Sequence, residues 1–239
     1  MPTIRYYSEG GVENRFAVKI RSGITDFYPT DTDVTDNYSI TYEYSTLTIT
    51  KRSITVTANS AEFEYDGQAH RCESFTSEEQ NGIRGLVSTD EITAQTSSLG
   101  TDAGDYDNAI LYDSVIITEI DGGKIVTDCY EIECVSGVMK ITPRKIVVKT
   151  GSGEWVYDGT PHYNRDGYEV TRPEGLSAPA IVDGQIFKVV ESTVIVDAGR
   201  IQNEFYSWEI TNGEKSNYEV EWDCGTLTVL SREVIVTAK

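Results

Sequence analysis

The chain has 239 residues, a formal charge of −19 and 38% apolar residues. This acidity excludes nucleic acid and anionic membrane surfaces as partners, because both are bound by basic faces. No apolar run approaches the roughly 18 residues that span a bilayer, so we expect no membrane insertion. The length is enough for one large domain or two ordinary ones.

In the first 50 residues, two alternating segments at 38–42 and 47–49 predict a β-hairpin. Three carboxylates precede it at positions i, i+2 and i+5. Carboxylates in a loop can hold calcium, so Asp31, Asp33 and Asp36 are the candidate ligands. We favour the alternative of a solvated acidic loop, because the equivalent loops at 118–128 and 211–216 do not keep this spacing. No other cofactor is expected.

The alternation of apolar residues shifts by one within 47–58. Leu47 and Ile49 are odd-numbered, whereas Ile54 and Val56 are even-numbered. A shift of one residue moves the apolar set to the other face of a strand. We interpret it as a domain border, where the last strand of one domain runs directly into the first strand of the next, each feeding its own core. The same shift occurs twice more, and the equivalent border residues are Arg52, Arg144 and Arg232.

Aligning these borders reveals an internal repeat of 92 residues (144−52) and then 88 residues (232−144). The predicted hairpin also recurs, as 130–134 with 139–141 and as 218–222 with 227–229. The repeat divides the chain into four parts. These are the second half of a repeat over 1–50, complete repeats over 51–142 and 143–230, and the first strand of a further repeat over 231–239.

Each complete repeat carries a Tyr-Asp-Gly turn and, farther on, an Asp-Ala-Gly turn. Asp-Gly after alternating apolar residues favours a tight turn. A histidine follows the first turn at the same spacing in both repeats. Because a catalytic histidine is rarely duplicated with its turn, we assign both histidines a structural role. The motif residues are Tyr65, Asp66, Gly67, His70, Tyr157, Asp158, Gly159 and His162.

No window keeps the spacing of apolar residues that predicts a helix. Each repeat instead offers six or seven short strands separated by turn signals. This pattern predicts an all-β fold of tandem antiparallel sandwiches. An enzyme is not expected, because the sequence has no Gly-x-Ser-x-Gly elbow, phosphate-binding loop or His-Glu-x-x-His motif, and we assign no catalytic residues.

The cysteines are Cys72, Cys129, Cys134 and Cys224. They form no Cys-x-x-Cys pair, so a zinc site is not expected. Cys129 and Cys134 lie five residues apart, on opposite faces if one strand carries both, and should not bridge each other. We favour free, buried thiols, and a disulfide from Cys72 to Cys134 or Cys129 is the alternative.

The two turns and the paired segments that run into a new strand resemble the YDG/MBG-type bacterial immunoglobulin-like repeats. The resemblance covers residues 51–230 and part of the flanks. It implies tandem immunoglobulin-like β-sandwiches in an elongated array, acting as a non-enzymatic stalk or adhesin segment. It also implies an extracellular place on a bacterial cell surface, with the export signal and the anchor outside this sequence. Such stalks also use Lys–Asn isopeptide crosslinks, for which Lys149 and Asn217 are candidates.

The expected partners are neighbouring repeats of the same protein or other copies of it. Residues 231–239 are a first strand without a domain, and residues 1–50 lack such a strand. Unpaired edges recruit strands, so we expect head-to-tail assembly by strand complementation.

The alternative function is a carbohydrate- or protein-binding module pair of a secreted protein, with a host glycan or protein as ligand. Tyr38, Tyr130 and Tyr218 recur at one repeat position, which indicates packing rather than binding. The non-recurrent aromatic residues are the ligand candidates, namely Tyr6, Tyr7, Tyr163 and Tyr168.

Overall fold

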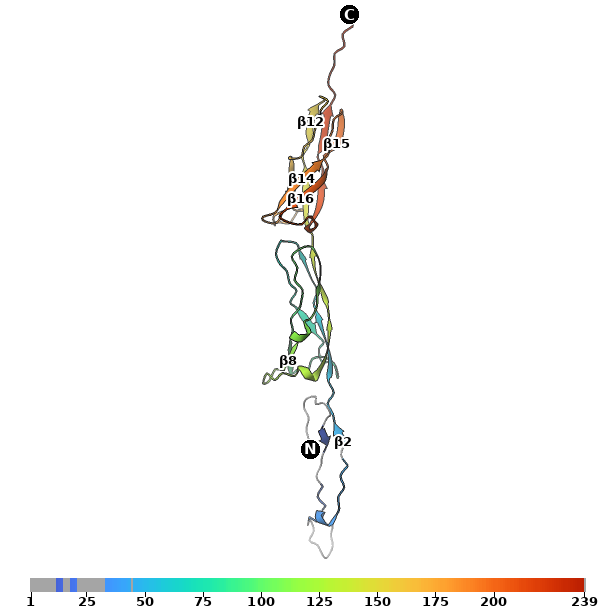
Figure 1. Ribbon diagram of the computed structural model, residues 1–239, viewed down its shortest axis with the longest axis vertical. Helices are drawn as coiled ribbons and strands as arrows, with labels where there is room; N and C mark the ends of the chain where they lie inside the picture. The colour runs from blue at the N-terminus through green and yellow to red at the C-terminus, as the bar shows by residue number, and fades with distance from the viewer. Residues whose placement is uncertain (1–11, 15–17, 21–32, 44, 239) are drawn as a thin grey trace. The chain divides into compact units, whose positions relative to one another are not determined.

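A computed structural model of the chain describes residues 12–14, 18–20, 33–43 and 45–238 (Figure 1). Within these ranges the regular elements are β-strands and short 3-10 turns, without an α-helix, so the all-β prediction is confirmed. Over the same ranges, no helix is long and apolar enough to cross a membrane.

The chain divides into two compact units. Unit 1 comprises Met1–Ala58, Phe75–Gln95 and Ile110–Val135, and unit 2 comprises Asn59–Ser74, Thr96–Ala109 and Ser136–Lys239. The first complete repeat therefore contributes strands to both units. As domain borders, the limits of the repeats stay a prediction.

Unit 1 is built on β3 (Arg52–Ala58), the central strand of a three-stranded sheet. Every second residue of β3 is buried, as expected where a β-branched strand turns one face to a core. Two neighbours, β5 (Phe75–Ser77) and β9 (Tyr130–Val135), flank it. The other strands of unit 1 form two antiparallel pairs, β6 (Asp90–Thr93) with β8 (Ile116–Glu119) and β1 (Val12–Asn14) with β2 (Ser45–Leu47).

Unit 2 has three three-stranded sheets and one strand pair. The first sheet has the order β4 (Ala61–Glu64), β10 (Gly137–Thr142), β7 (Gly104–Asn108). The second has the order β13 (Tyr168–Thr171), β11 (Arg144–Thr150), β17 (Tyr218–Asp223). The third has the order β12 (Gly153–Val156), β18 (Thr226–Leu230), β15 (Gly199–Gln202), and the pair is β14 (Ile186–Ser192) with β16 (Phe205–Thr211).

The strand pairing follows the sequence repeat. Strand β11 lies between antiparallel β13 and parallel β17, as β3 lies between antiparallel β5 and parallel β9. Strand β18 lies between β12 and β15, as β10 lies between β4 and β7. The register is also the same, because Arg52 is opposite Tyr130 and Arg144 is opposite Tyr218.

The predicted antiparallel pairing is wrong for four strand pairs. The pairs β3–β9, β4–β10, β11–β17 and β12–β18 are parallel. A parallel pair needs a long crossover, and here the strands between the two members of each pair supply it. Apolar alternation identifies the buried face of a strand, but it does not identify the neighbour or its direction.

The predicted hairpins at 130–141 and 218–229 are also wrong. Strands β9 and β10 follow each other in the chain but belong to different sheets, and so do β17 and β18. Gly225 does not make a hairpin turn. A Cβ there would lie 2.5 Å from the Thr150 carbonyl oxygen, so the glycine permits close approach of two backbones as the chain passes between sheets.

Buried side chains continue across the border at Pro143. Met139 and Ile141 before the border belong to the same buried cluster as Ile146 and Val148 after it. Separate cores were predicted here, and the structure instead has one continuous cluster. Its continuity comes from packing between the repeats, described below, which no alternation pattern reveals.

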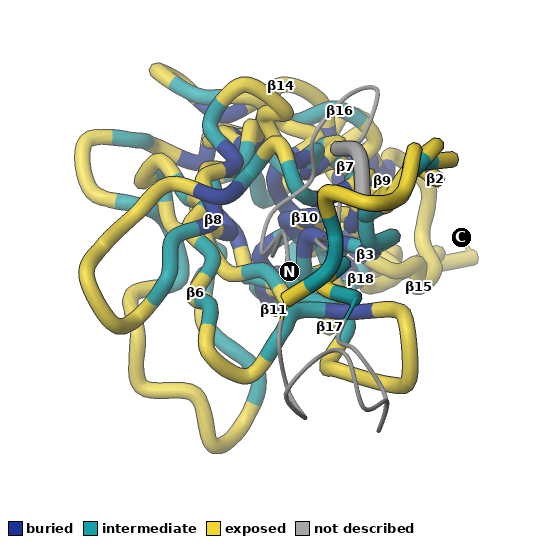
Figure 2. Tube along the Cα trace, turned by 90° about the horizontal axis from the view of Figure 1, so that it is seen from below, coloured by how far each residue is buried: buried dark blue, intermediate teal, exposed yellow. Residues whose placement is uncertain are grey.

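The other two borders differ from this one. Ile54 after the first border is fully buried, whereas Leu47 before it is exposed and Ile49 is half-buried. Beyond the last border, Val234 and Val236 are 76% and 89% exposed. Figure 2 shows this C-terminal segment as an exposed tube.

Candidate functional site

The second Tyr-Asp-Gly turn contains a histidine bound to the turn aspartate. His162 Nε2 lies 3.0 Å from Asp158 Oδ1, and its ring stacks on Trp155 with centroids 4.8 Å apart. Asp158 Oδ1 also accepts hydrogen bonds from the N–H and the hydroxyl of Thr160 at 2.9 and 2.7 Å. Gly159 has a φ of +79°, in the left-handed region that glycine adopts at little cost. The imidazole is thus part of the turn.

The first turn has the same arrangement. His70 Nε2 lies 2.9 Å from Asp66 Oδ1, which also accepts a hydrogen bond from the N–H of Gln68 at 2.8 Å. The His70 ring stacks on Phe63 with centroids 4.4 Å apart. The fixed spacing of histidine and aspartate in both repeats follows from this contact.

Hydrogen bonding lowers the pKa of both turn aspartates. For Asp158, the backbone N–H of Thr160 has the largest effect, followed by the Thr160 hydroxyl, and with a further contribution from His162 they lower the pKa to about 2. Burial alone would raise the pKa of Asp66, but hydrogen bonds from Gln68 and His70 outweigh it and the pKa is lowered. Both turns therefore favour the ionised carboxylate.

Arg144, the first residue of β11, joins the first turn to the second repeat. It is only 6% exposed. Its Nη1 donates a hydrogen bond to the Tyr65 carbonyl at 3.0 Å, and its Nε donates to the carbonyls of Pro179 and Ala180 at 3.1 and 3.2 Å. A buried guanidinium can bind several fixed oxygens at once because its five N–H groups lie in one plane.

The Tyr65 side chain is held by two residues of the second repeat, Gln185 and Tyr218. Its hydroxyl accepts a hydrogen bond from Gln185 Nε2 at 2.7 Å, and its ring packs edge-on against Tyr218 at 5.6 Å. The Tyr218 hydroxyl in turn donates to Gln185 Oε1 at 2.7 Å and accepts from the Val182 N–H at 3.0 Å. Tyr65 is consequently buried to 3% exposure.

The second repeat also binds the Asp-Ala-Gly turn of the first repeat. Asn217, fully buried at the end of the 3-10 turn η4 (Lys215–Asn217), donates to Asp102 Oδ1 at 2.8 Å and accepts from the Ala103 N–H at 2.7 Å. We call Arg144, Val182, Gln185, Asn217 and Tyr218 together the turn-binding site of unit 2. An ion pair between Glu64 and Arg172, at 2.6 Å, lies beside it.

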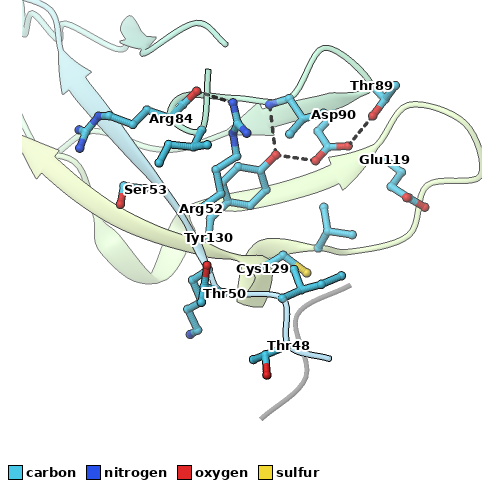
Figure 3. A pocket seen from close by; sticks show the side chains of 15 residues that line it. Thr48, Thr50, Arg52, Ser53, Arg84, Thr89, Asp90, Glu119, Cys129 and Tyr130 are labelled. Carbon is cyan, nitrogen blue, oxygen red and sulfur yellow. Dashed lines mark hydrogen bonds between the residues drawn. The ribbon is translucent and has the colours of Figure 1, made fainter. Parts of the chain in front are cut away.

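Unit 1 has the corresponding groups. Arg52 donates through Nε to the Gly85 carbonyl at 2.6 Å and through Nη2 to the Gly82 carbonyl at 3.1 Å. Tyr130 donates to Asp90 Oδ2 at 2.6 Å and accepts from the Val87 N–H at 3.2 Å (Figure 3). Burial, with the hydrogen bond to Asp90, raises the pKa of Tyr130 to about 12.

The side chains of Arg52, Asp90 and Tyr130 line a pocket of about 710 Å³ together with residues 48–51. In Figure 3 the Tyr130 ring lies beside Arg52, and its hydroxyl points to Asp90. Cys129 stands where unit 2 has Asn217, so the pocket lacks the amide that binds an Asp-Ala-Gly turn. In unit 2 such groups bind a tyrosine-bearing turn, whereas in unit 1 they line the pocket.

The structure places two of the three predicted calcium ligands, and Asp31 lies outside the described residues. Asp33 Oδ1 accepts hydrogen bonds from the N–H and hydroxyl of Thr35 at 3.1 and 2.6 Å, and Asp36 lies in η1 (Thr35–Asn37). Among the residues that the structure describes, no group of three or more His, Cys, Asp or Glu side chains could hold a metal ion.

All four cysteines are free thiols, so the alternative disulfide from Cys72 is not formed. Their predicted burial holds for Cys72 alone, because Cys134 is exposed and the other two are half-buried. The Cys72 thiol is buried and donates to the Asn59 carbonyl at 3.3 Å. The isopeptide candidates are also separated. Lys149 is opposite Asp223, whereas Asn217 precedes Tyr218 at the other end of β17, so the two residues lie about six residues, or roughly 20 Å, apart along the strand.

Of the tyrosines predicted as ligand contacts, Tyr6 and Tyr7 lie outside the described residues. Tyr168 packs against Phe187 and Phe205 in the core of unit 2, so its assignment as an exposed contact is wrong. Tyr163 is exposed, with the Arg165 guanidinium 4.7 Å from its ring centroid. Of the two candidates that the structure describes, Tyr163 therefore remains as a ligand contact.

Two buried asparagines are equivalent in the repeats and were not singled out in the sequence. Asn108 Nδ2 donates to the Asn59 carbonyl at 2.8 Å, and Asn203 Nδ2 donates to the Gly151 carbonyl at 2.9 Å. Both are fully buried. The repeat could have identified both asparagines, because each lies four residues after the glycine of an Asp-Ala-Gly turn.

No protein-family model and no curated protein matches the chain. The site must therefore be interpreted from its own geometry.

Proposed function

We propose that the chain is a non-enzymatic structural segment of a large bacterial cell-surface or secreted protein. In this proposal, tandem immunoglobulin-like sandwiches form a stalk or adhesin shaft outside the cell, and each repeat is fixed to the next. The observation that carries the proposal is the binding of Tyr65, in the turn of one repeat, by Arg144, Gln185 and Tyr218 of the next.

The border between these repeats has the properties of a fixed joint. Only Pro143 separates β10 from β11, and proline restricts its own φ, so the connection has no flexible linker. Buried side chains from both repeats surround this covalent link, namely Tyr65 from the first repeat and Arg144, Asn217 and Tyr218 from the second. Such contacts serve to transmit force and hold an angle, which a stalk requires and a catalyst does not.

Small-angle X-ray scattering of the full chain at dilute concentration tests the proposal. A compact protein of 239 residues would have a radius of gyration of about 18 Å. We expect a clearly larger value and an elongated distance distribution. Arg144→Ala should broaden that distribution, whereas Arg200→Ala, at an exposed arginine of the same unit, should leave it unchanged. A compact, near-spherical envelope would contradict the stalk proposal.

A further inference from the structure

The C-terminal segment has the sequence of a buried strand but is exposed. By the repeat, Val234 and Val236 are equivalent to Ile146 and Val148 of β11, which are fully buried. Residues 231–238 belong to no strand in the structure. An exposed apolar strand with free backbone groups recruits another strand. The question is which strand it fits.

The repeat identifies a fitting acceptor near the N-terminus. Thr35–Asn37 form η1, and the Tyr38 N–H caps it at the Thr35 carbonyl, as η4 precedes Tyr218. Tyr38 is nevertheless 57% exposed, whereas Tyr218 is 6% exposed. Residues 38–41 belong to no strand, although the equivalent residues begin β17, the parallel neighbour of β11.

We propose that residues 232–238 of one molecule add as a parallel strand beside the segment that begins at Tyr38 of a second molecule. The inference rests on the proposed function, because it applies the contact between consecutive repeats to two copies of the chain. The register follows from Arg144 opposite Tyr218 and Arg52 opposite Tyr130, which places Arg232 opposite Tyr38. Val234 is then opposite Ile40, with its side chain turned to the same face as Ile146 in β11.

The side chains of donor and acceptor near this strand pair are equivalent to those that join the two complete repeats. Asn37 of the acceptor is equivalent to Asn217, and Asp197 of the donor is equivalent to Asp102. Tyr157 of the donor, 39% exposed, is equivalent to Tyr65 and meets Tyr38 as Tyr65 meets Tyr218. Asn37 supplies the amide that Cys129 lacks, so the N-terminal segment fits a donor turn better than the pocket of unit 1 does.

This contact joins different surfaces of two identical molecules. Residues 232–238 and the segment that begins at Tyr38 are different surfaces, so a copy that uses one of them in a contact still offers the other. Contacts of this kind give open chains unless the geometry closes a ring. The inference therefore specifies linear, head-to-tail growth that depends on concentration.

Sedimentation velocity of the full chain over a wide concentration range tests the inference. We expect species that grow with concentration, and Val236→Asp should abolish them. Ile235→Asp is the matched control, because Ile235 is equally exposed but equivalent to Thr55 and Val147, which are only partly buried. Circular dichroism of both variants checks that the fold is kept. A monomer at every concentration, or equal loss in both variants, would overturn the inference.

Two further readouts test the register and the acceptor. Hydrogen exchange should slow in residues 38–41 and 232–238 together as the concentration rises. Asn37→Ala should raise the concentration needed for assembly about tenfold, as expected for a lost hydrogen bond to a carboxylate, whereas Ser39→Ala should not. Assembly without protection of 38–41 would reject this acceptor. Scattering at dilute concentration tests the stalk separately, because it needs no self-association.

Discussion

The Asn217 side chain binds the Asp102 carboxylate at 2.8 Å, although the two residues are 115 positions apart and lie in different repeats. The amide is fully buried and also accepts a hydrogen bond from the Ala103 N–H. A polar side chain therefore fixes how the turn of one repeat meets the 3-10 turn of the next.

Removing this amide should destabilise unit 2. Asn217→Ala leaves the Asp102 carboxylate and the Ala103 N–H without their partner, and we expect a loss of about 2 kcal/mol in urea unfolding. Asn217→Asp should cost more, because it places a second carboxylate beside Asp102. Exposed Ser216→Ala is the control. Equal stability of Asn217→Ala and the control would contradict the role of the amide.

The two turn glycines offer a matched comparison. Gly67 and Gly159 have nearly identical φ values of +78° and +79°. Alanine at Gly159 meets no atom closer than 4.0 Å, so Gly159→Ala should cost only the backbone strain of about 1–2 kcal/mol. A Cβ at Gly67 would lie 2.6 Å from Val182 Cγ1, so Gly67→Ala should cost more, measured as a lower melting temperature.

A second substitution isolates the clash. The double variant Gly67→Ala/Val182→Ala should lose less stability than the sum of its single variants, because the clash is absent. Strict additivity would show that the turn does not press on Val182.

The lowered pKa of Asp158 predicts acid sensitivity of the second turn. Its pKa falls from 3.8 to about 2 on folding, so the carboxylate stabilises the folded state fully above its unfolded pKa. That contribution is lost as the pH drops from about 4 through about 2. We expect Thr160→Val, which removes the hydroxyl donor, to raise the Asp158 pKa in an NMR titration. In urea unfolding, the loss of stability between about pH 4 and about pH 2 should be smaller in Asp158→Asn than in the unmodified protein. Asp121→Asn, at an exposed loop position, should leave that loss unchanged.

Two equivalent positions of the repeat, one buried and one exposed, should respond differently to truncation. Ile146→Ala removes a fully buried side chain and should cost about 2–5 kcal/mol in urea unfolding. Val234→Ala, at the equivalent but exposed position, should change the stability of the dilute protein by less than about 0.5 kcal/mol. A large loss in dilute Val234→Ala would mean that the C-terminal strand packs within its own molecule.

The sequence predicted several local features of the fold. Alternation placed strands at β3, β11 and β18, because each turns every second side chain to a core. It failed for strand partners. The pairs β9–β10 and β17–β18 look like hairpins since two alternating segments are joined by a short link, but the link leads into another sheet. Sheet membership depends on contacts distant in sequence, which a local pattern does not contain.

The site was predictable only in part. The repeat marked Arg52 and Arg144 as equivalent, and both bind loop carbonyls. It did not show that Arg144 also binds Tyr65, because that contact joins two repeats. Tyr38 was expected to pack like Tyr130 and Tyr218, yet it is exposed, and no described segment covers it. Burial at a repeat position requires the covering loop as well as the side chain.

The acceptors of Arg144 are main-chain oxygens. Carbonyls do not titrate, and they cannot rotate away as a carboxylate side chain can. An ion pair such as Glu64–Arg172 weakens at high salt, since dissolved ions screen it. The buried hydrogen bond from Arg144 to the Tyr65 carbonyl is less dependent on salt, so the joint between the two repeats should persist at ionic strengths that break surface ion pairs.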